Sequence, residues 1–169
     1  SVKESEKLSK MLDEKGKFNF PDDCARIAYR NIPIVAGETD ENLEIHYRRK
    51  VLKEFENIIS YEFNDINLLK TALTHSSYAN ENSIESNERM EFLGDAVLEL
   101  CMSKYLYSVI DLDEGVLTKS RAKAVCEDAL NVYAKRINLS KFLYLGKGEE
   151  CSGGRERPAI IADAFEAVL

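Results

Sequence analysis

The spacing of apolar residues is the feature that most limits what this chain can fold into. From Leu43 to the end of the chain, apolar side chains recur every three or four residues, as they do on one face of an α-helix. An example is the run Val51, Leu52, Phe55, Ile58 and Ile59. No segment alternates apolar and polar residues for long enough to predict a β-sheet. The sequence therefore predicts an all-α protein.

Turn and capping residues divide this stretch into separate elements. Asn64 and Asp65 are typical of a helix start, and glycine, proline and polar residues mark later interruptions. The expected later elements are helices over about residues 87–108, 116–136 and 159–169, and loops over residues 80–86 and 145–158.

The first part of the chain differs from the rest. The pattern of residues 1–44 predicts two short helices, with Gly16 and Pro21 at the break between them. Residues 36–42 are typical of a linker. No motif occurs in this part. We expect a short helical appendage of unknown role over residues 1–44, followed by one helical domain over residues 45–169.

Acidic residues are concentrated in the expected domain. A net charge of −7 would normally argue against a nucleic-acid partner, because phosphate binding depends on cationic side chains. Residues 1–50 hold 10 basic and 10 acidic residues, whereas residues 51–169 hold 13 basic and 20 acidic ones. This local excess has two explanations: a solvated acidic face, or a site for divalent cations.

The spacing of the carboxylates favours a cation site. Glu88, Glu91 and Asp95 are three and then four residues apart, so they share one face of the predicted helix. Asp163 and Glu166 repeat the three-residue step on the last helix. Both ladders have apolar neighbours, and carboxylates that border a core must become neutral, pair or bind a cation. If the two helices pack together, four carboxylates could surround Mg²⁺.

Simpler roles remain open for the same residues. Acidic pairs at helical spacing are often solvated faces, and Arg89 and Lys104 could pair with the first ladder. His75 has no nucleophile motif beside it, so we expect it to cap or orient a helix end. The glycines around Lys147 do not form a phosphate loop.

Several other classes of protein are excluded. No apolar run approaches the ~18 residues needed to cross a bilayer, and the first residues do not resemble a signal peptide. The four cysteines are widely spaced, which is typical of reduced thiols and not of a disulfide framework or a zinc site. We therefore expect a cytoplasmic protein without a membrane partner.

One segment carries a family resemblance. Residues 87–98, NERMEFLGDAVL, resemble the signature of the ribonuclease III family. Further segments that are similar to this family occur in the family's order: residues 71–78, 113–115, 117–122, 145–150, 152–158 and 162–167. The resemblance spans about residues 46–169.

The resemblance implies a helical endonuclease domain that hydrolyses double-stranded RNA with Mg²⁺, for which Mn²⁺ is expected to substitute. By their positions in the motifs, the metal-binding and catalytic carboxylates would be Glu91, Asp95, Asp163 and Glu166. Glu88 and Glu114 match two further acidic positions that line the family's cleft. Metal ions would also offset part of the excess negative charge.

The resemblance also implies a homodimer. Phe92 matches a residue that family members insert into a pocket of the partner, and an ordinary core phenylalanine is the alternative. Candidate phosphate contacts for A-form RNA are Lys119, Arg121, Lys123, Lys147, Arg155 and Arg157. For each of these, a solvated surface role is the alternative.

The chain departs from the family pattern at its C-terminal side. The family's double-stranded-RNA-binding domain is missing, so we expect RNA binding to be weak and sensitive to salt. The last helix ends three residues after Glu166, so we expect a C-terminally truncated domain. Two alternatives to an enzyme are a non-catalytic RNA-binding or ribosome-associated relative, and an interaction module that uses residues 1–44. The complete acidic set favours the enzyme.

Overall fold

The computed structural model describes residues 41–169, with side chains from residue 50 onward. The predicted appendage helices lie outside this range. The first described helix begins at Glu41, inside the predicted linker and ahead of the predicted domain boundary at residue 45. Within the described range every regular element is a helix, so the all-α prediction is confirmed. The elements are α3 (Glu41–Ile59), α4 (Ile66–Ala72), α5 (Ser76–Asn82), α6 (Glu88–Val109), α7 (Glu114–Ala124), α8 (Glu127–Arg136), η1 (Leu139–Phe142), α9 (Lys147–Cys151), η2 (Gly154–Glu156) and α10 (Pro158–Val168).

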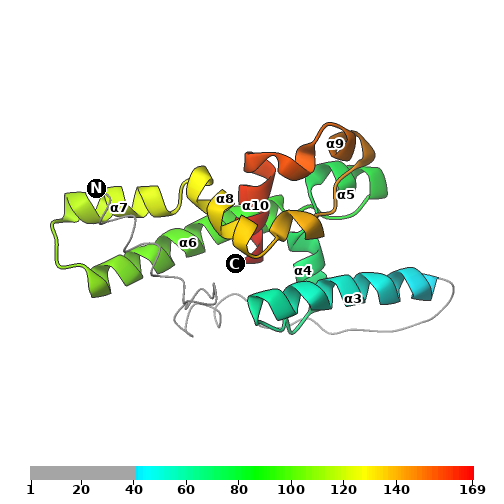
Figure 1. The fold of residues 1–169 in the computed structure, drawn as a ribbon, viewed down its shortest axis with the longest axis horizontal. Coiled ribbons are helices and arrows are strands. Elements are labelled where there is room, and N and C mark those ends of the chain that lie inside the picture. Colours follow the sequence, from blue (N-terminus) through cyan, green and yellow to red (C-terminus); the bar gives the residue numbers. More distant parts are fainter. Residues whose placement is uncertain (1–40) are drawn as a thin grey trace.

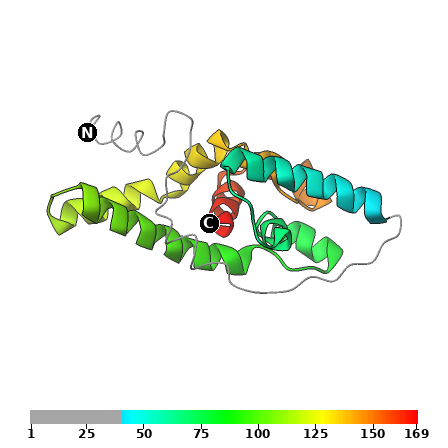
Figure 2. The ribbon, with the colours of Figure 1, turned by 90° about the horizontal axis from the view of Figure 1, so that it is seen from below.

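The last helix, α10, forms the centre of the fold. Pro158 occupies its first turn, where the missing N–H has no helical partner to lose. Ile160, Ile161, Ala164 and Phe165 are buried, and α10 packs against both α6 and α8. Figures 1 and 2 show α10 inside the molecule with longer helices around it. Any acidic residue on this helix therefore lies close to the core.

The core around α10 is completed by α3, α4 and η1. Phe55 of α3 is fully buried, and its ring centroid lies 5.0 Å from that of Phe142 in η1. Asp65 caps α4 as predicted, because its carboxylate accepts the N–H of Asn67 at 2.9 Å. The helix α4 also packs on α10, which places the turn after α4 beside the central helix.

The C-terminal part of α6 pairs with α7 to form an arm. Met102 and Leu106 of α6 pack with Ala124 of α7 in a small second core. The two helices extend together away from the rest of the molecule in both ribbon views (Figures 1 and 2). The helices in the described range do not combine the length and hydrophobicity that a membrane span requires.

The single helix predicted over residues 116–136 is wrong. The chain forms α7 and α8 instead, and Cys126 between them has an extended backbone. Val125 packs against both the main core and the core of the arm, so the chain turns back toward α10 at this point. Periodicity alone did not reveal the break, because both helices continue the apolar spacing.

The two predicted loops are partly helical. The helix α5 extends into residues 80–86 and ends before Ser83, which has a left-handed backbone with φ of 54°. Residues 145–158 contain α9 and η2. The helix α9 begins where the Lys147 N–H donates to the Glu81 carboxylate of α5 at 2.8 Å. This short helix thus depends on a tertiary contact that local sequence does not show.

Candidate metal centre

The helices α6 and α10 approach each other closely at Gly94. A Cβ atom at this position would lie 1.9 Å from the backbone carbonyl oxygen of Glu166, which is far inside van der Waals contact. Glycine is therefore the residue that permits this packing. Because Glu91 and Asp95 flank Gly94 on α6, the same close approach brings the first acidic ladder against the second.

Three predicted carboxylates converge at this crossing. One carboxylate oxygen from each of Glu91, Asp163 and Glu166 lies within 4.8 Å of the other two, and all three side chains are half-buried. We call these three residues the carboxylate cluster. Asp95 is exposed and outside the cluster, but near enough to raise the pKa of both Glu91 and Glu166. The structure thus brings the two ladders together.

Burial and mutual repulsion disfavour the charged forms in the cluster. Burial is the main cause that raises the pKa of Glu166 to about 7, and repulsion from Asp95 and the other two cluster members adds to it. Burial and the charge of Asp163 raise the pKa of Glu91. Burial also raises the pKa of Asp163. Each of these carboxylates would therefore be stabilised by a cation placed among them.

The donor set fits a divalent cation such as Mg²⁺. All the available ligands are carboxylate oxygens, which Mg²⁺ prefers. Within residues 50–169, no lysine or arginine forms an ion pair with a cluster member, and the exposed Arg89 does not pair with the first ladder. A half-buried group of acids without a basic partner is an arrangement that a metal ion stabilises. The cluster is therefore a candidate metal centre.

The two accessory acidic residues lie at different distances from the cluster. Glu88 is exposed at the start of α6, accepts a hydrogen bond from Ser86 Oγ at 3.0 Å, and raises the pKa of Glu91. Glu114 begins α7 and lies beside Tyr107 on the arm. Tyr107 follows Glu91 by 16 residues on α6, a separation of about 24 Å along a helix. Glu114 is therefore not part of the centre formed by its own chain.

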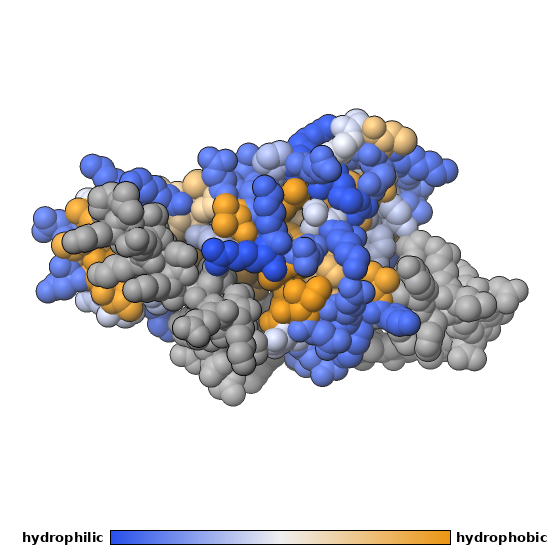
Figure 3. Space-filling view, viewed as in Figure 1, coloured by the Kyte–Doolittle hydropathy of each residue, from blue (hydrophilic) through white to orange (hydrophobic). Residues whose placement is uncertain are grey.

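The outward face of α6 carries exposed apolar residues. Phe92 is 82% exposed and Leu93 is 57% exposed, so the alternative of a core phenylalanine is wrong. Adjacent helix positions differ by about 100°, so Phe92 faces outward where Glu91 faces α10. Leu100 and Tyr107 are also exposed further along α6. The hydrophobic colour at the free end of the arm in Figure 3 shows that this exposure continues there.

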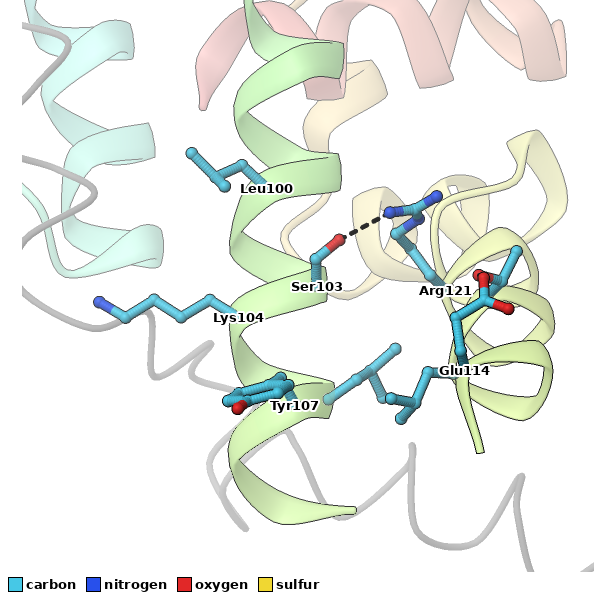
Figure 4. A pocket seen from close by; sticks show the side chains of 9 residues that line it. Leu100, Ser103, Lys104, Tyr107, Glu114 and Arg121 are labelled. Atoms are coloured by element: carbon cyan, nitrogen blue, oxygen red, sulfur yellow. Dashed lines mark hydrogen bonds between the residues drawn. The ribbon is translucent and has the colours of Figure 1, made fainter. Parts of the chain in front are cut away.

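A pocket of about 360 Å³ lies between α6 and α7 on the arm. Its lining includes Leu100, Leu117, Tyr107 and Glu114. In Figure 4, Arg121 reaches across from α7 and donates to Ser103 Oγ of α6, at 2.9 Å. Lys104 also lies here on the arm, so it is not beside the first ladder, with which the simpler interpretation would have paired it.

The candidate phosphate contacts fall into two groups. The exposed lysines are Lys119, Lys123 and Lys147. The arginines bond residues of their own chain: Arg121 to Ser103, Arg155 to Glu150, and Arg157 to Glu149. The Arg155 guanidinium also donates to the backbone carbonyl oxygens of two residues near η1, so it holds the segment before α9 in place.

Two residues near the cluster were not assigned this place by sequence reasoning. The carboxylate of Glu127, at the start of α8, raises the pKa of Asp163, and His75 lowers it. His75 also caps α5, as expected. Neither residue is on the same helix as a ladder, so spacing along the chain carries no signal of their position near Asp163.

The chain is similar in sequence to known ribonucleases. A family model described as Ribonuclease-III-like matches residues 65–169. Ribonuclease 3 of Listeria welshimeri is 50% identical over 121 residues, which cover 69% of this chain and 53% of that protein. Ribonuclease 3 of Caldanaerobacter subterraneus is 56% identical over 122 residues, which cover 70% and 54%. The chain thus spans about half the length of these curated relatives.

Solved structures agree with the sequence comparison. The nuclease domain of ribonuclease III from Campylobacter jejuni superposes with a TM-score of 0.65 at 42% identity, covering 69% of this chain and 80% of that one. That structure is described as flexible in a region involved in dimer formation. Taken together, the helical fold, the converging carboxylates and these similarities identify a protein of the nuclease-domain class. The chain belongs to the ribonuclease III family.

Proposed function

We propose that this chain is an endoribonuclease that hydrolyses phosphodiester bonds of double-stranded RNA in a Mg²⁺-dependent reaction of RNA processing. The observation that carries the proposal is the carboxylate cluster, in which oxygens of three acids from two helices lie within 4.8 Å of one another. Family membership supports the type of reaction, because the named relatives are Ribonuclease 3 proteins.

The acidic residues have distinct places in the proposed reaction. Glu91, Asp163 and Glu166 would hold the metal from the core side, and the exposed Asp95 would complete the set from the solvent side. Bound Mg²⁺ would polarise the scissile phosphate and activate water, with Mn²⁺ as a substitute. The chain supplies the ligands and keeps them in place through the close packing at Gly94. Glu88 adds negative charge at the rim.

The substrate would be recognised through its backbone. A-form RNA is read mainly through phosphate and 2′-hydroxyl groups, for which exposed cations are suitable partners. Lys119 and Lys123 are exposed one turn apart on α7, and Lys147 is exposed at the start of α9. With few such contacts, binding would be weak and would fall steeply with salt.

We also propose that two copies pair through the outward face of α6. Phe92, Ala96 and Leu100 are exposed at four-residue steps, and Tyr107 continues the same stripe. We call these four residues the α6 stripe. An antiparallel pairing of two α6 helices centred near Leu100 would cover the stripe of both copies. It would place Phe92, eight residues before Leu100, opposite position 108 of the second copy.

This pairing gives the arm pocket an occupant. Position 108 directly follows Tyr107, which lines the pocket between α6 and α7 (Figure 4). The Phe92 ring of one copy would therefore enter the pocket of the other. The same pairing would bring Glu114, which lines the pocket, toward the first turns of the partner's α6. Glu114 would then lie near the metal centre of the second copy, whereas it is too far from the metal centre of its own chain to contribute there.

A cleavage assay tests the enzymatic proposal directly. A long RNA duplex and a DNA duplex of the same sequence are incubated with the chain while Mg²⁺ is titrated. We expect endonucleolytic cuts in RNA only, rising with Mg²⁺ and absent with a chelator. If the chain binds the RNA duplex but leaves it uncut at every Mg²⁺ concentration, the non-catalytic alternative replaces the enzyme.

A further inference from the structure

Arg89 is an exposed cation in the first turn of α6. Within residues 50–169 its side chain forms neither an ion pair nor a hydrogen bond. The adjacent Glu88 accepts a hydrogen bond from Ser86 Oγ at 3.0 Å and does not pair with it. Arg89 precedes Phe92 by three residues, so the two side chains share the outward face of the helix. A positive charge therefore lies one turn before the α6 stripe.

The turn that joins α6 to α7 is acidic. Asp111 and Asp113 lie in this turn, Glu114 begins α7, and all three residues are exposed. In the described part of the chain no basic side chain forms an ion pair with any of them. Glu114 accepts a hydrogen bond from Thr118 Oγ1 at 2.9 Å, whereas the Asp111 carboxylate has no partner in this range.

These acids are not arranged as a second metal site. Among the described residues, the carboxylate cluster is the one group of acids whose oxygens converge closely enough to hold an ion. The negative charge of the turn therefore remains uncompensated within one copy. A basic side chain from another molecule would reduce the mutual repulsion of these carboxylates.

Arg89 and Asp111 cannot pair within one chain. The helix between them, α6, has 22 residues, which corresponds to a length of about 33 Å. Both ribbon views place the acidic turn at the free end of the arm, far from the start of α6 (Figures 1 and 2). The positive and the negative charge thus lie at opposite ends of the same helix.

The positions of the two residues match the register of the proposed pairing of α6 helices. Each lies eleven residues from Leu100, where that pairing is centred. An antiparallel pairing would therefore place Arg89 of each copy level with Asp111 of the other. The apolar residues require the same register, because Phe92 then lies opposite position 108, beside the arm pocket.

We propose that Arg89 forms an ion pair with Asp111 of a second copy of the chain, and that this pair fixes the antiparallel register. This inference rests on the proposed pairing of α6 helices. Because a two-fold axis relates the two copies, the ion pair would occur twice. A parallel pairing would instead place Arg89 against Arg89 and one acidic turn against the other, which repulsion disfavours.

The ion pair would also have a consequence for the metal centre. Glu114 follows Asp111 by three residues, and Arg89 precedes Glu91 by two. A bond between Arg89 and Asp111 of the second copy would therefore hold that copy's Glu114 beside the turn of α6 that carries Glu91.

Reversing the charges tests the pair, with sedimentation analysis as the measurement. We expect Arg89→Glu and Asp111→Lys each to raise the homodimer Kd about 10–100-fold, because each puts like charges together at both ends of the interface. An equimolar mixture of the two variants should associate about as tightly as the wild type, since both ends then hold opposite charges. If the mixture associates no more tightly than the separate variants, the proposal is overturned.

Matched controls carry the same changes of charge on α8. Lys135→Glu and Asp128→Lys alter exposed residues outside the α6 stripe, so each should leave the homodimer Kd nearly unchanged. Salt gives an independent readout, because it screens exposed charges. The wild-type Kd should rise with salt, whereas the Kd of Arg89→Glu should fall as its repulsion is screened. The same salt response in both proteins would contradict the ion pair.

The outcomes separate this inference from the proposed function. A wild-type chain that is monomeric at all concentrations would end both the pairing and the ion pair, whatever its cleavage activity. A wild-type dimer with an unchanged Kd in Arg89→Glu would overturn the ion pair alone. If Arg89→Glu weakens binding of an RNA duplex, measured by fluorescence anisotropy, but leaves the homodimer Kd unchanged, Arg89 contacts phosphate and not the second copy.

Discussion

The two faces of α6 differ in an unusual way: the inner face partly buries an acidic residue, and the outer face exposes an aromatic one. The face toward α10 holds the half-buried carboxylate of Glu91, whereas the outward face exposes the aromatic ring of Phe92, the next residue along the chain. Burial of charge is unfavourable unless it is paired, and an exposed apolar stripe is typical of a surface that is covered by a partner. In our proposals a cation binds the carboxylates of the inner face, and a second copy of the chain covers the apolar residues of the outer face.

Neighbouring residues on a helix can face different surroundings, because each step along the chain rotates the side chain by about 100°. We therefore expect substitutions on the two faces of α6 to affect different properties. Changes on the inner face should affect metal binding and cleavage in each copy, and changes on the outer face should affect association first.

The largest effect is expected from Glu166→Gln, which removes a proposed metal ligand at nearly constant volume. We expect cleavage of an RNA duplex to fall at least about 1,000-fold, equivalent to about 4 kcal/mol of barrier. Circular dichroism should show unchanged helical content. Glu156→Gln, at an exposed position in η2, is the matched control and should retain full activity. Equal cleavage by both variants would rule out the assigned centre.

The next largest effect concerns the crossing of α6 and α10. Because a Cβ atom at position 94 would meet the backbone of Glu166, Gly94→Ala should force the two helices apart. We expect a loss of about 1–3 kcal/mol in the free energy of unfolding, together with weaker Mg²⁺ binding. Gly115→Ala, where nothing lies within 4 Å of the new atom, should leave both quantities nearly unchanged or raise stability slightly.

The outer face is tested by Phe92→Ala. A buried aromatic anchor in an interface contributes about 2–4 kcal/mol, so the Kd of the homodimer should rise at least about 30-fold. Sedimentation analysis across a range of concentrations measures this change. Val132→Ala, at a half-exposed position on α8 outside the α6 stripe, is the control. A monomeric wild-type chain at all concentrations would end the dimer proposal.

A smaller effect is expected for the pH dependence of stability without metal. The pKa of Glu166 is about 7 in the folded chain against 4.5 in the unfolded chain, so the folded state holds the extra proton between these values. Stability of the wild type relative to Glu166→Gln should therefore fall from pH 4.5 to pH 7, by about 1–3 kcal/mol, and stay lower above pH 7.

Denaturant titrations in chelator at pH 5 and pH 8 measure this difference. Saturating Mg²⁺ should remove the disadvantage of the wild type at pH 8, because the metal stabilises the charged carboxylates. A difference between wild type and variant that does not change with pH would show that Glu166 is not in the electrostatic environment described here.

Local patterns anticipated a large part of this molecule. The period of the apolar residues predicted α6 and α10 well, and Asp65 and His75 were expected near the helix starts that they cap. The ladder spacing also placed Glu91 and Asp163 on faces that could meet. These predictions succeed because helix period and capping depend on residues within one or two turns.

Other features depend on contacts between distant segments. The break at Cys126 follows from the position of the arm relative to the core, and α9 depends on the contact between Lys147 and Glu81. Arg155 is one of the candidate RNA contacts, and the fold adds an ion pair with Glu150 that the sequence analysis did not identify. No spacing rule along the chain encodes these partners.

The sequence by itself determined the helical class of this protein, the two acidic ladders and the family signature between residues 87 and 98. The tertiary structure decided which acids meet, which apolar residues stay outside, and why Glu114 is remote from its own chain's centre. The physical reason is that a helix fixes directions around its own axis, whereas only the packing at Gly94 sets where two such axes cross.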